Sequence, residues 1–275
     1  MKRPNTCVNL IKAINTIAKG GDPVRLSRAM ANVIVGQFLP DGAVKGGSSL
    51  MFRYGGAITR YTRDVDVARK LELDEYLRRM EELLAQGWNG FAGMLVKVEP
   101  PNPKGVPSKY VMLPYDIKLS YMGRPWQTVR IEVGHNEIGD ADESELALPS
   151  ELAAAFEQLD FPVPKPVPVM GIAHQIAQKL HAVSEANSER AHDLIDLQLM
   201  AAQSNLDWAD VKSKCVRLFD YRKMQAWPPT VAPGADWDRI YKTALDTMHD
   251  KAGILENAAL ATTWVNSFIR QIQSA

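Results

Sequence analysis

The first forty residues carry two stripes of apolar side chains at helical spacing, which predict two helices. The first stripe follows Thr6, a residue that can cap a helix. The second follows Asp22 and Pro23, a capping residue and a proline suited to the first helical turn. The residues of the two stripes are Leu10, Ile14 and Ile17, and then Leu26, Met30 and Val33.

A third helix and three strands are expected between residues 73 and 133. Asp74 can cap the helix and Gly87 can stop it. Its stripe comprises Leu73, Leu77, Met80 and Leu84. Alternating apolar residues predict the strands, with inward side chains from Met94, Val96 and Val98, then Ile117, Leu119 and Tyr121, then Val129, Ile131 and Val133. Gly123, Arg124 and Pro125 separate the last two strands and indicate an antiparallel hairpin.

The stretch FPVPKPVPV at residues 161–169 holds four prolines and predicts an extended connector, because proline cannot continue a helix. From Gly171 onward the apolar spacing is helical. We therefore expect an α+β fold. A small mixed sheet with flanking helices would occupy residues 1–160, and an all-helical domain would occupy residues 161–275.

Composition adds the class of protein to this outline. Of the 275 residues, 46% are hydrophobic and 23% are charged, as in a folded globular protein. Basic and acidic residues number 32 each, so any basic surface for a nucleic acid must be local. Cys7 and Cys215 are too few for a disulfide framework. The apolar runs are too short for a signal peptide or a membrane span, so a soluble, cytoplasmic protein without a membrane partner is expected.

Two aspartates one residue apart, Asp64 and Asp66, are the first candidates for chemistry. Residues i and i+2 of a strand face the same side, so both carboxylates would project together while Val65 and Val67 face the core. Such a pair can hold Mg²⁺ between the phosphates of a nucleotide and an attacking oxygen. Taken alone, a solvated acidic face on an edge strand explains the pair better.

Gly46, Gly47, Ser48 and Ser49 form a turn before these acids. Glycines let the backbone approach a phosphate, and exposed amides with two hydroxyls suit an anion. A plain loop into a helix explains the turn at least as well, and the spacing is not that of a Walker A loop. A phosphate turn, a short helix and an acid-bearing strand in this order nevertheless resemble the core of the nucleotidyltransferase superfamily.

Glu132 is a candidate third metal ligand. It is out of phase with Ile131 and Val133, so it should lie on the polar face of its strand. The superfamily usually has an acid on the strand next to the aspartate pair, which binds a second metal. An exposed polar residue opposite Arg130 is the alternative, and the two explanations are about level.

The helical half contributes Lys179 and Asp193. Both are in register with apolar stripes, so their side chains are expected on the inward faces of their helices. The stripe residues are Ile172, Ile176 and Val183 for the lysine, and Leu197 and Met200 for the aspartate. Because an unpaired buried charge is costly, the two side chains either pair with each other or face a cleft whose ligand needs them.

A basic stretch follows at residues 212–227, where Phe219, Tyr221 and Trp227 are interleaved with lysines and arginines. This mixture suits an RNA backbone with stacked bases. A solvated helix with its aromatic residues in the core explains it better.

Four motifs in order resemble the AbiEii/AbiGii nucleotidyltransferase toxins, a family that includes MenT-type members. They are KGGSSL at 45–50, RYTRDVD at 60–66, KL at 179–180 and RAHDLID at 190–196. Their order and spacing agree with the family over most of the chain. Two positions depart from it: His192 stands where a basic residue is more common, and the third acid, Glu132, is not an aspartate.

The resemblance implies a toxin of a type IV toxin–antitoxin or phage-defence system, with a cognate antitoxin that acts directly or indirectly. It implies transfer of a nucleoside monophosphate from an NTP, with Mg²⁺ or Mn²⁺, to an acceptor. For some members this acceptor is the 3′ end of tRNA, whose modification would block translation and growth. Transfer to a protein or a small molecule, and a non-catalytic nucleotide-binding or partner-binding module, are the alternatives.

Site residues follow from the same resemblance. Lys179 would neutralise charge on the triphosphate and the departing pyrophosphate, and Asp193 would orient it or assist the acceptor hydroxyl. The helical domain would thus complete the active-site cleft. The implied catalytic residues are Thr62, Asp64, Asp66, Lys179 and Asp193; the nucleotide-binding residues are Lys45, Gly46, Gly47, Ser48, Ser49 and Lys179; and the metal ligands are Asp64, Asp66 and Glu132.

Overall fold

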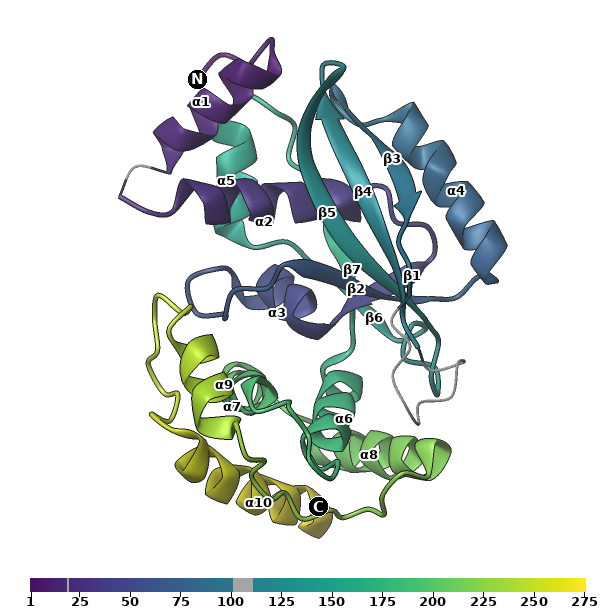
Figure 1. Ribbon diagram of the computed structural model, residues 1–275, viewed down its shortest axis with the longest axis vertical. Coiled ribbons are helices and arrows are strands. Elements are labelled where there is room, and N and C mark those ends of the chain that lie inside the picture. The colour runs from purple at the N-terminus through teal and green to yellow at the C-terminus, as the bar shows by residue number, and fades with distance from the viewer. Residues whose placement is uncertain (19, 101–110) are drawn as a thin grey trace. The chain divides into compact units, whose positions relative to one another are not determined.

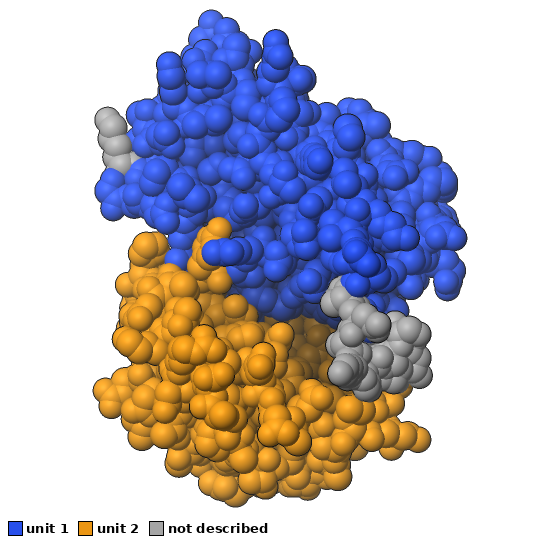
Figure 2. Space-filling view, in the orientation of Figure 1, with its two compact units in different colours: residues 1–55, 62–169 blue, residues 56–61, 170–275 orange. Residues whose placement is uncertain are grey.

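The computed structural model describes residues 1–18, 20–100 and 111–275, and the chain divides into two compact units (Figure 2). Unit 1 comprises Met1–Gly55 and Thr62–Val169, and unit 2 comprises Gly56–Tyr61 and Met170–Ala275. The main division therefore falls after Val169, whereas residue 160 was expected. The end of the proline-rich stretch is not a connector but a short strand, which joins the sheet of unit 1 through the pairing of Val44 with Val169.

Unit 1 contains five helices and seven strands among its described residues (Figure 1). The helices are α1 Cys7–Ile17, α2 Pro23–Gly36, α3 Gly46–Tyr54, α4 Leu73–Gln86 and α5 Ser150–Gln158. The strands are β1 Gly42–Lys45, β2 Asp64–Arg69, β3 Phe91–Lys97, β4 Leu113–Tyr121, β5 Arg124–His135, β6 Ser144–Ala147 and β7 Val167–Met170.

The strands form one mixed sheet in the order β3-β4-β5-β2-β1-β7-β6. β4 and β5 make the predicted antiparallel hairpin, with Gly123 in its turn. β5 then pairs in parallel with β2, and β2 pairs in antiparallel fashion with β1. The predicted small mixed sheet with flanking helices is confirmed.

One face of the central strands is apolar and covered by helices. Val65 and Val67 are fully buried as predicted, and α2 packs on β5 while α4 packs on β3. The inward residues of β4 and β5 are also buried, and they are Ile117, Leu119, Tyr121, Val129, Ile131 and Val133. The opposite face of β2 and β5 is left for the polar side chains of these strands.

The helix starts agree with the sequence in two cases and differ in a third. Thr6 accepts a hydrogen bond from the Asn9 amide, and Asp22 accepts hydrogen bonds from the amides at the start of α2. α4 begins at Leu73, one residue before the predicted cap, so Asp74 lies inside its first turn. An acidic residue there still favours the helix, since the N-terminus carries a partial positive charge.

The predicted phase of β3 is wrong. Met94 is 65% exposed, whereas Gly93 and Leu95 lie opposite the buried Leu119 and Ile117. A Cβ atom at Gly93 would lie 2.8 Å from the Leu84 side chain of α4, so the close approach of the helix requires glycine at an inward position. A glycine does not count as apolar in an alternating pattern, and this concealed the true phase.

Unit 2 is helical in its regular structure, as expected. Its helices are α6 Ile172–Val183, α7 His192–Gln203, α8 Trp208–Arg222, α9 Trp237–Leu245 and α10 Ala258–Ser274. α6 packs against both α7 and α8, and the fully buried Tyr241 of α9 accepts a hydrogen bond from Gln198 of α7. None of the helices in the described parts of the chain is both long and apolar enough to cross a membrane.

Phe91 is the centre of an aromatic cluster in unit 1, with the rings of Tyr121, Trp126 and Phe161 between 4.6 and 5.4 Å from its own. Phe91→Ala should lower the free energy of unfolding by about 3–5 kcal/mol, because the cavity cannot be refilled by such rigid neighbours. Met94→Ala on the same strand should change it by less than about 0.5 kcal/mol. Urea unfolding of both variants measures the difference, and equal effects would contradict this packing.

Candidate active site

Strand pairing places the predicted acids of unit 1 on one face of the sheet. In the parallel ladder between β2 and β5, Asp66 is opposite Glu132 and Asp64 is opposite Arg130. Register partners on neighbouring strands project to the same side. These four side chains therefore share the face opposite the apolar core, which confirms the predicted polar orientation of Glu132.

β1 extends this row on the other side of β2. Lys45 is the register partner of Asp66 in the antiparallel ladder between the two strands. Lys45, Asp66 and Glu132 thus form one row across three adjacent strands. A cation beside two carboxylates reduces their mutual repulsion and supplies a positive group next to the start of α3.

α3 begins at Gly46, so the predicted turn is itself the first turn of the helix. Gly46 has a φ of +66°, and a Cβ atom on it would overlap Asp66 Oδ2. Only glycine allows the carboxylate to approach the helix start this closely. The first amides of a helix lack carbonyl partners within it, and among the described residues the cap Lys45 forms no side-chain hydrogen bond to them. This helix start is therefore suited to an anion such as a phosphate.

Two predicted site hydroxyls hold the backbone at Asp64. Ser48 Oγ donates to the Asp64 carbonyl oxygen at 2.5 Å, and Thr62 Oγ1 donates to the same oxygen at 3.5 Å. Ser48 and Ser49 are both fully buried. A nucleotide at this turn would consequently meet backbone amides of α3 more readily than these serine hydroxyls.

The donor set fits a divalent metal that is completed by a substrate. In the described part of the chain, no group of three or more histidine, cysteine, aspartate or glutamate side chains is close enough to hold a metal ion by itself. Mg²⁺ is commonly held by one or two carboxylates together with substrate phosphates and waters. Asp64 and Asp66 provide such carboxylates beside the start of α3, which is suited to an anion, and the three-ligand set with Glu132 remains a prediction.

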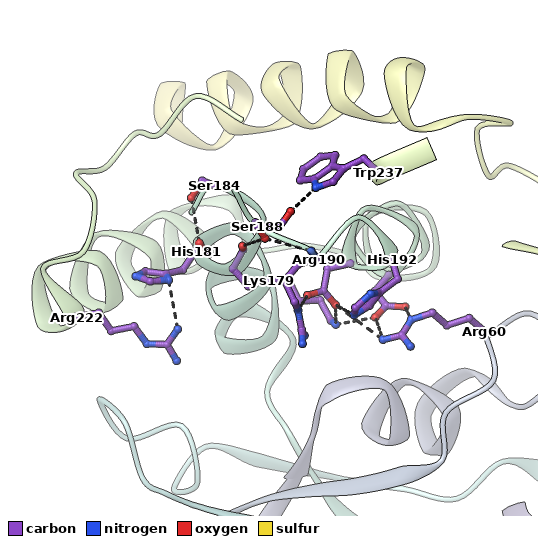
Figure 3. A network of polar contacts seen from close by, with 12 residues as sticks. Arg60, Lys179, His181, Ser184, Ser188, Arg190, His192, Arg222 and Trp237 are labelled. Carbon is purple, nitrogen blue, oxygen red and sulfur yellow. Dashed lines mark hydrogen bonds and ion pairs between the residues drawn. The ribbon is translucent and has the colours of Figure 1, made fainter. Parts of the chain in front are cut away.

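Unit 2 holds a second cluster, built around Lys179 on α6. The lysine is buried as predicted, and its Nζ lies 2.6 Å from Asp193 Oδ1 and 2.6 Å from Asp196 Oδ2, both on α7. Of the two alternatives left open by the spacing, the structure thus contains the pairing between helices. Figure 3 shows Lys179 beside Arg60, Arg190 and His192.

Two arginines that lie outside α6 and α7, Arg60 and Arg190, complete the cluster. Arg60 binds Asp196 in bidentate fashion, with Nε 2.9 Å from Oδ1 and Nη2 2.8 Å from Oδ2. Arg190 Nε donates to Asp193 Oδ2 at 2.7 Å. With three cations and two carboxylates the cluster carries a net charge of +1, provided that His192 is neutral.

The pKa values of the acids and of His192 follow from burial and these charges. Burial raises the pKa of Asp193 and Asp196, but nearby cations outweigh it and hold both pKa values below the usual range. These cations are chiefly Lys179 and Arg190 for Asp193, and Arg60 and Lys179 for Asp196. Burial lowers the pKa of His192 to about 4, against a partial opposing effect of Asp193. His192 is therefore neutral and both acids are ionised at neutral pH.

The loop between α6 and α7 is fixed by its own hydrogen bonds (Figure 3). Ser188 Oγ donates to the Ala182 carbonyl oxygen at 2.6 Å and accepts from the Arg190 amide at 3.2 Å. The Trp237 indole donates to the Ser188 carbonyl oxygen. These contacts place Arg190 next to the first turn of α7.

Sequence reasoning did not assign roles to Arg60 and Asp196. Asp196 could have been found, because it lies three residues after Asp193 and therefore on the same face of the helix. Arg60 could not, because 136 positions separate it from its partner and nothing in its local pattern points to unit 2.

The basic stretch at residues 212–227 is largely used inside unit 2. Lys214 is buried 3.7 Å from Asp210, and Lys212 Nζ binds the Gln273 carbonyl oxygen at 2.8 Å. Phe219 is buried as well. The preferred explanation, a solvated helix with its aromatic residues in the core, is confirmed for Phe219 only, because Tyr221 is 39% exposed and Trp227 is partly buried beyond the end of α8.

The mixed sheet, with paired acids beside a helix start and a helical unit after it, defines a protein with a nucleotidyltransferase-type fold. The chain belongs to the AbiEii family, since the family model described as nucleotidyl transferase AbiEii toxin, type IV TA system, matches residues 28–264. The predicted family is thereby confirmed, and so is a nucleotidyltransferase toxin as the class of protein.

Solved structures with similar folds include MenT4, a nucleotidyltransferase toxin from Mycobacterium tuberculosis. It shares 18% sequence identity with a TM-score of 0.50, over 91% of this chain and 81% of that chain. JHP933 from Helicobacter pylori has 16% identity and a TM-score of 0.45, over 91% of each chain. At these identities the similarity to MenT4 shows a common fold. A search of curated proteins finds no match.

Lys179→Met should lower the free energy of unfolding by about 3–5 kcal/mol, because it leaves two buried carboxylates without their shared cation. Arg190→Met is the control. Its side chain is 51% exposed, so its ion pair with Asp193 is screened by solvent and should contribute less than about 1 kcal/mol. Urea unfolding compares the two variants, and a Lys179→Met effect no larger than the control would refute the cluster's energetic role.

His192 should make the chain sensitive to acid. Its pKa is about 4 in the folded chain and about 6.5 when unfolded, so the unfolded chain alone takes up a proton between these values. The free energy of unfolding should therefore fall as the pH drops from about 6.5 to about 4, and His192→Gln should flatten this dependence. Asp193 and Asp196 also stabilise the folded chain through their lowered pKa values. Their contribution to the free energy of unfolding is lost only below about pH 4, so it does not affect this pH range.

The measurement is urea unfolding at pH steps between 4 and 7, and His249→Gln, at an exposed position, is the control. If His192→Gln keeps the wild-type slope while His249→Gln changes it, the assignment to His192 is wrong.

Proposed function

We propose that this chain transfers a nucleoside monophosphate from an NTP to the 3′ end of tRNA, with Mg²⁺ or Mn²⁺ as the metal. One observation carries the proposal: the face of the sheet that bears Asp64, Asp66 and Glu132 adjoins the glycine-rich start of α3. The carboxylates that would bind a metal and the backbone amides that would bind a phosphate are therefore adjacent, because Asp66 lies against Gly46. A solvated acidic face would not require a glycine there.

Unit 1 supplies the binding of the nucleotide in this proposal. The first amides of α3 hold the phosphates, and Gly46 keeps the backbone close enough to Asp66 for both to serve the same group. Asp64 and Asp66 would hold the metal, which when bound would polarise the α-phosphate and stabilise the charge that develops there. Ser48 and Thr62 hold the Asp64 backbone and so position its carboxylate.

Unit 2 supplies positive charge. Asp193 is fully buried, and its lowered pKa makes it a poor proton acceptor, so it orients Lys179 instead of deprotonating the acceptor hydroxyl. The net positive charge of the cluster is suited to neutralising phosphate oxygens as pyrophosphate leaves. We therefore propose a catalytic role for Lys179 and a positioning role for Asp193.

The biological setting follows from the family. A type IV toxin has a cognate antitoxin, and we propose that modification of tRNA by this chain blocks translation and restricts growth or phage propagation. The reaction would take place in the cytoplasm, where NTPs and tRNA are available.

The test is incubation of the full chain with α-labelled NTPs, one at a time, with Mg²⁺ and total tRNA. Wild type should label tRNA, EDTA should stop the labelling and added Mg²⁺ should restore it. Asp64→Asn and Asp66→Asn should lower the rate by at least about a hundredfold, since the carboxylates act in the transition state. Asp238→Asn, at an exposed position of unit 2, should leave the rate unchanged.

Two outcomes would replace this proposal. Label on protein or on a small molecule, with none on tRNA, would indicate a different acceptor on the same fold. Absence of any labelled product, together with wild-type growth effects of Asp64→Asn in cells, would indicate a non-catalytic binding module.

A further inference from the structure

Arg130 on β5 is a guanidinium next to the candidate metal ligands that the preceding scheme does not use. Its register partners are Asp64 on β2 and Asp116 on β4. Its Nε donates to Asp116 Oδ1 at 2.6 Å, and its side chain is 38% exposed. Between residues 1–18, 20–100 and 111–275, Asp116 is the hydrogen-bond partner that the structure provides for this guanidinium.

The bond to Asp116 fixes the guanidinium but leaves most of its donors for another group. A guanidinium has five N–H donors in a planar fork, and Asp116 takes the one on Nε. The outer edge, formed by Nη1 and Nη2, has the geometry that binds a carboxylate or a phosphate in bidentate fashion. The Arg130 side chain is 38% exposed, so a ligand from solvent can reach it.

The order of the strands indicates which phosphate this edge would meet. β2 lies between β1, which leads into the anion-binding start of α3, and β5, which carries Arg130. In an in-line displacement at phosphorus, the attacking and leaving oxygens lie on opposite sides of the transferred group. With the triphosphate held on the β1 side of Asp64 and Asp66, the acceptor approaches from the β5 side.

We propose that Arg130 binds a backbone phosphodiester of the acceptor RNA, close to the 3′ hydroxyl that receives the nucleotide, and that Asp116 positions it. The proposal rests on the proposed function and adds a residue for the acceptor. A phosphodiester is suited to this place because it is present in any RNA end, whatever the base sequence.

Binding of 5′-fluorescein-labelled tRNA to the full chain without NTP tests the contact directly, by fluorescence anisotropy over a range of salt concentrations. Arg130→Gln should weaken binding about tenfold and reduce the slope of log K against log salt by about 0.7, as expected for one lost phosphate contact on a single strand. Lys118→Gln is the matched control. It removes an exposed cation two residues from Asp116 on the same face of β4, and binding should change less than twofold.

Steady-state kinetics then separate acceptor from nucleotide. Arg130→Gln should raise KM for tRNA about tenfold and leave KM for the NTP within about twofold, and Arg130→Lys, which keeps charge but not the fork, should recover part of the loss. Circular dichroism checks that each variant folds. If Arg130→Gln does not fold, Arg130→Lys and Asp116→Asn take its place.

A rise in KM for the NTP alone would place Arg130 at the nucleotide and overturn the proposal. Equal effects of Arg130→Gln and Lys118→Gln on tRNA binding would also overturn it, because a general electrostatic field would then suffice. If wild type binds tRNA through Arg130 but transfers no label to it, the contact is upheld and the proposed function fails.

Discussion

The register of β2 against β5 is the constraint on which the candidate site depends. Because side chains alternate along a strand, a slip of one residue would send Asp66 into the core and Val67 to the surface. The buried Val67 and Val133 are register partners, as are Asp66 and Glu132 one position earlier. Hydrophobic burial on one face therefore aligns the carboxylates on the other, and the site needs no interaction between the acids themselves to hold them side by side.

Unit 2 arranges its functional candidates by a different principle. Its charges are inside, and each carboxylate of the Lys179 cluster has more than one cation within reach. Such a cluster does not add much net stability over an apolar core, since desolvation opposes the attraction between the charges. It does specify geometry, because α6, α7 and the segment that carries Arg60 must all be in place before every charge is paired. Precision, more than stability, is what this arrangement contributes.

Much of this could be predicted from local patterns, and the failures have physical causes. The acid pair, its orientation and the inward positions of Lys179 and Asp193 follow from periodicities of two and of 3.6 residues. The phase of β3 could not be predicted, because the inward residue Gly93 has no side chain to register in the pattern. The start of α3 at Gly46 and the partner of Arg60 depend on contacts between segments distant in the chain, which periodicity does not encode.

The path of the chain through Gly56–Tyr61 has a consequence for synthesis. This short segment belongs to unit 2 although the residues on both sides of it belong to unit 1. The Tyr61 amide is bound by Thr247 Oγ1 at 2.9 Å, and the Ala57 carbonyl oxygen by the Asp250 amide at 3.0 Å. During translation Arg60 thus leaves the ribosome long before its carboxylate partner, and residues 170–275 by themselves lack one cation of the cluster that their folding would otherwise complete.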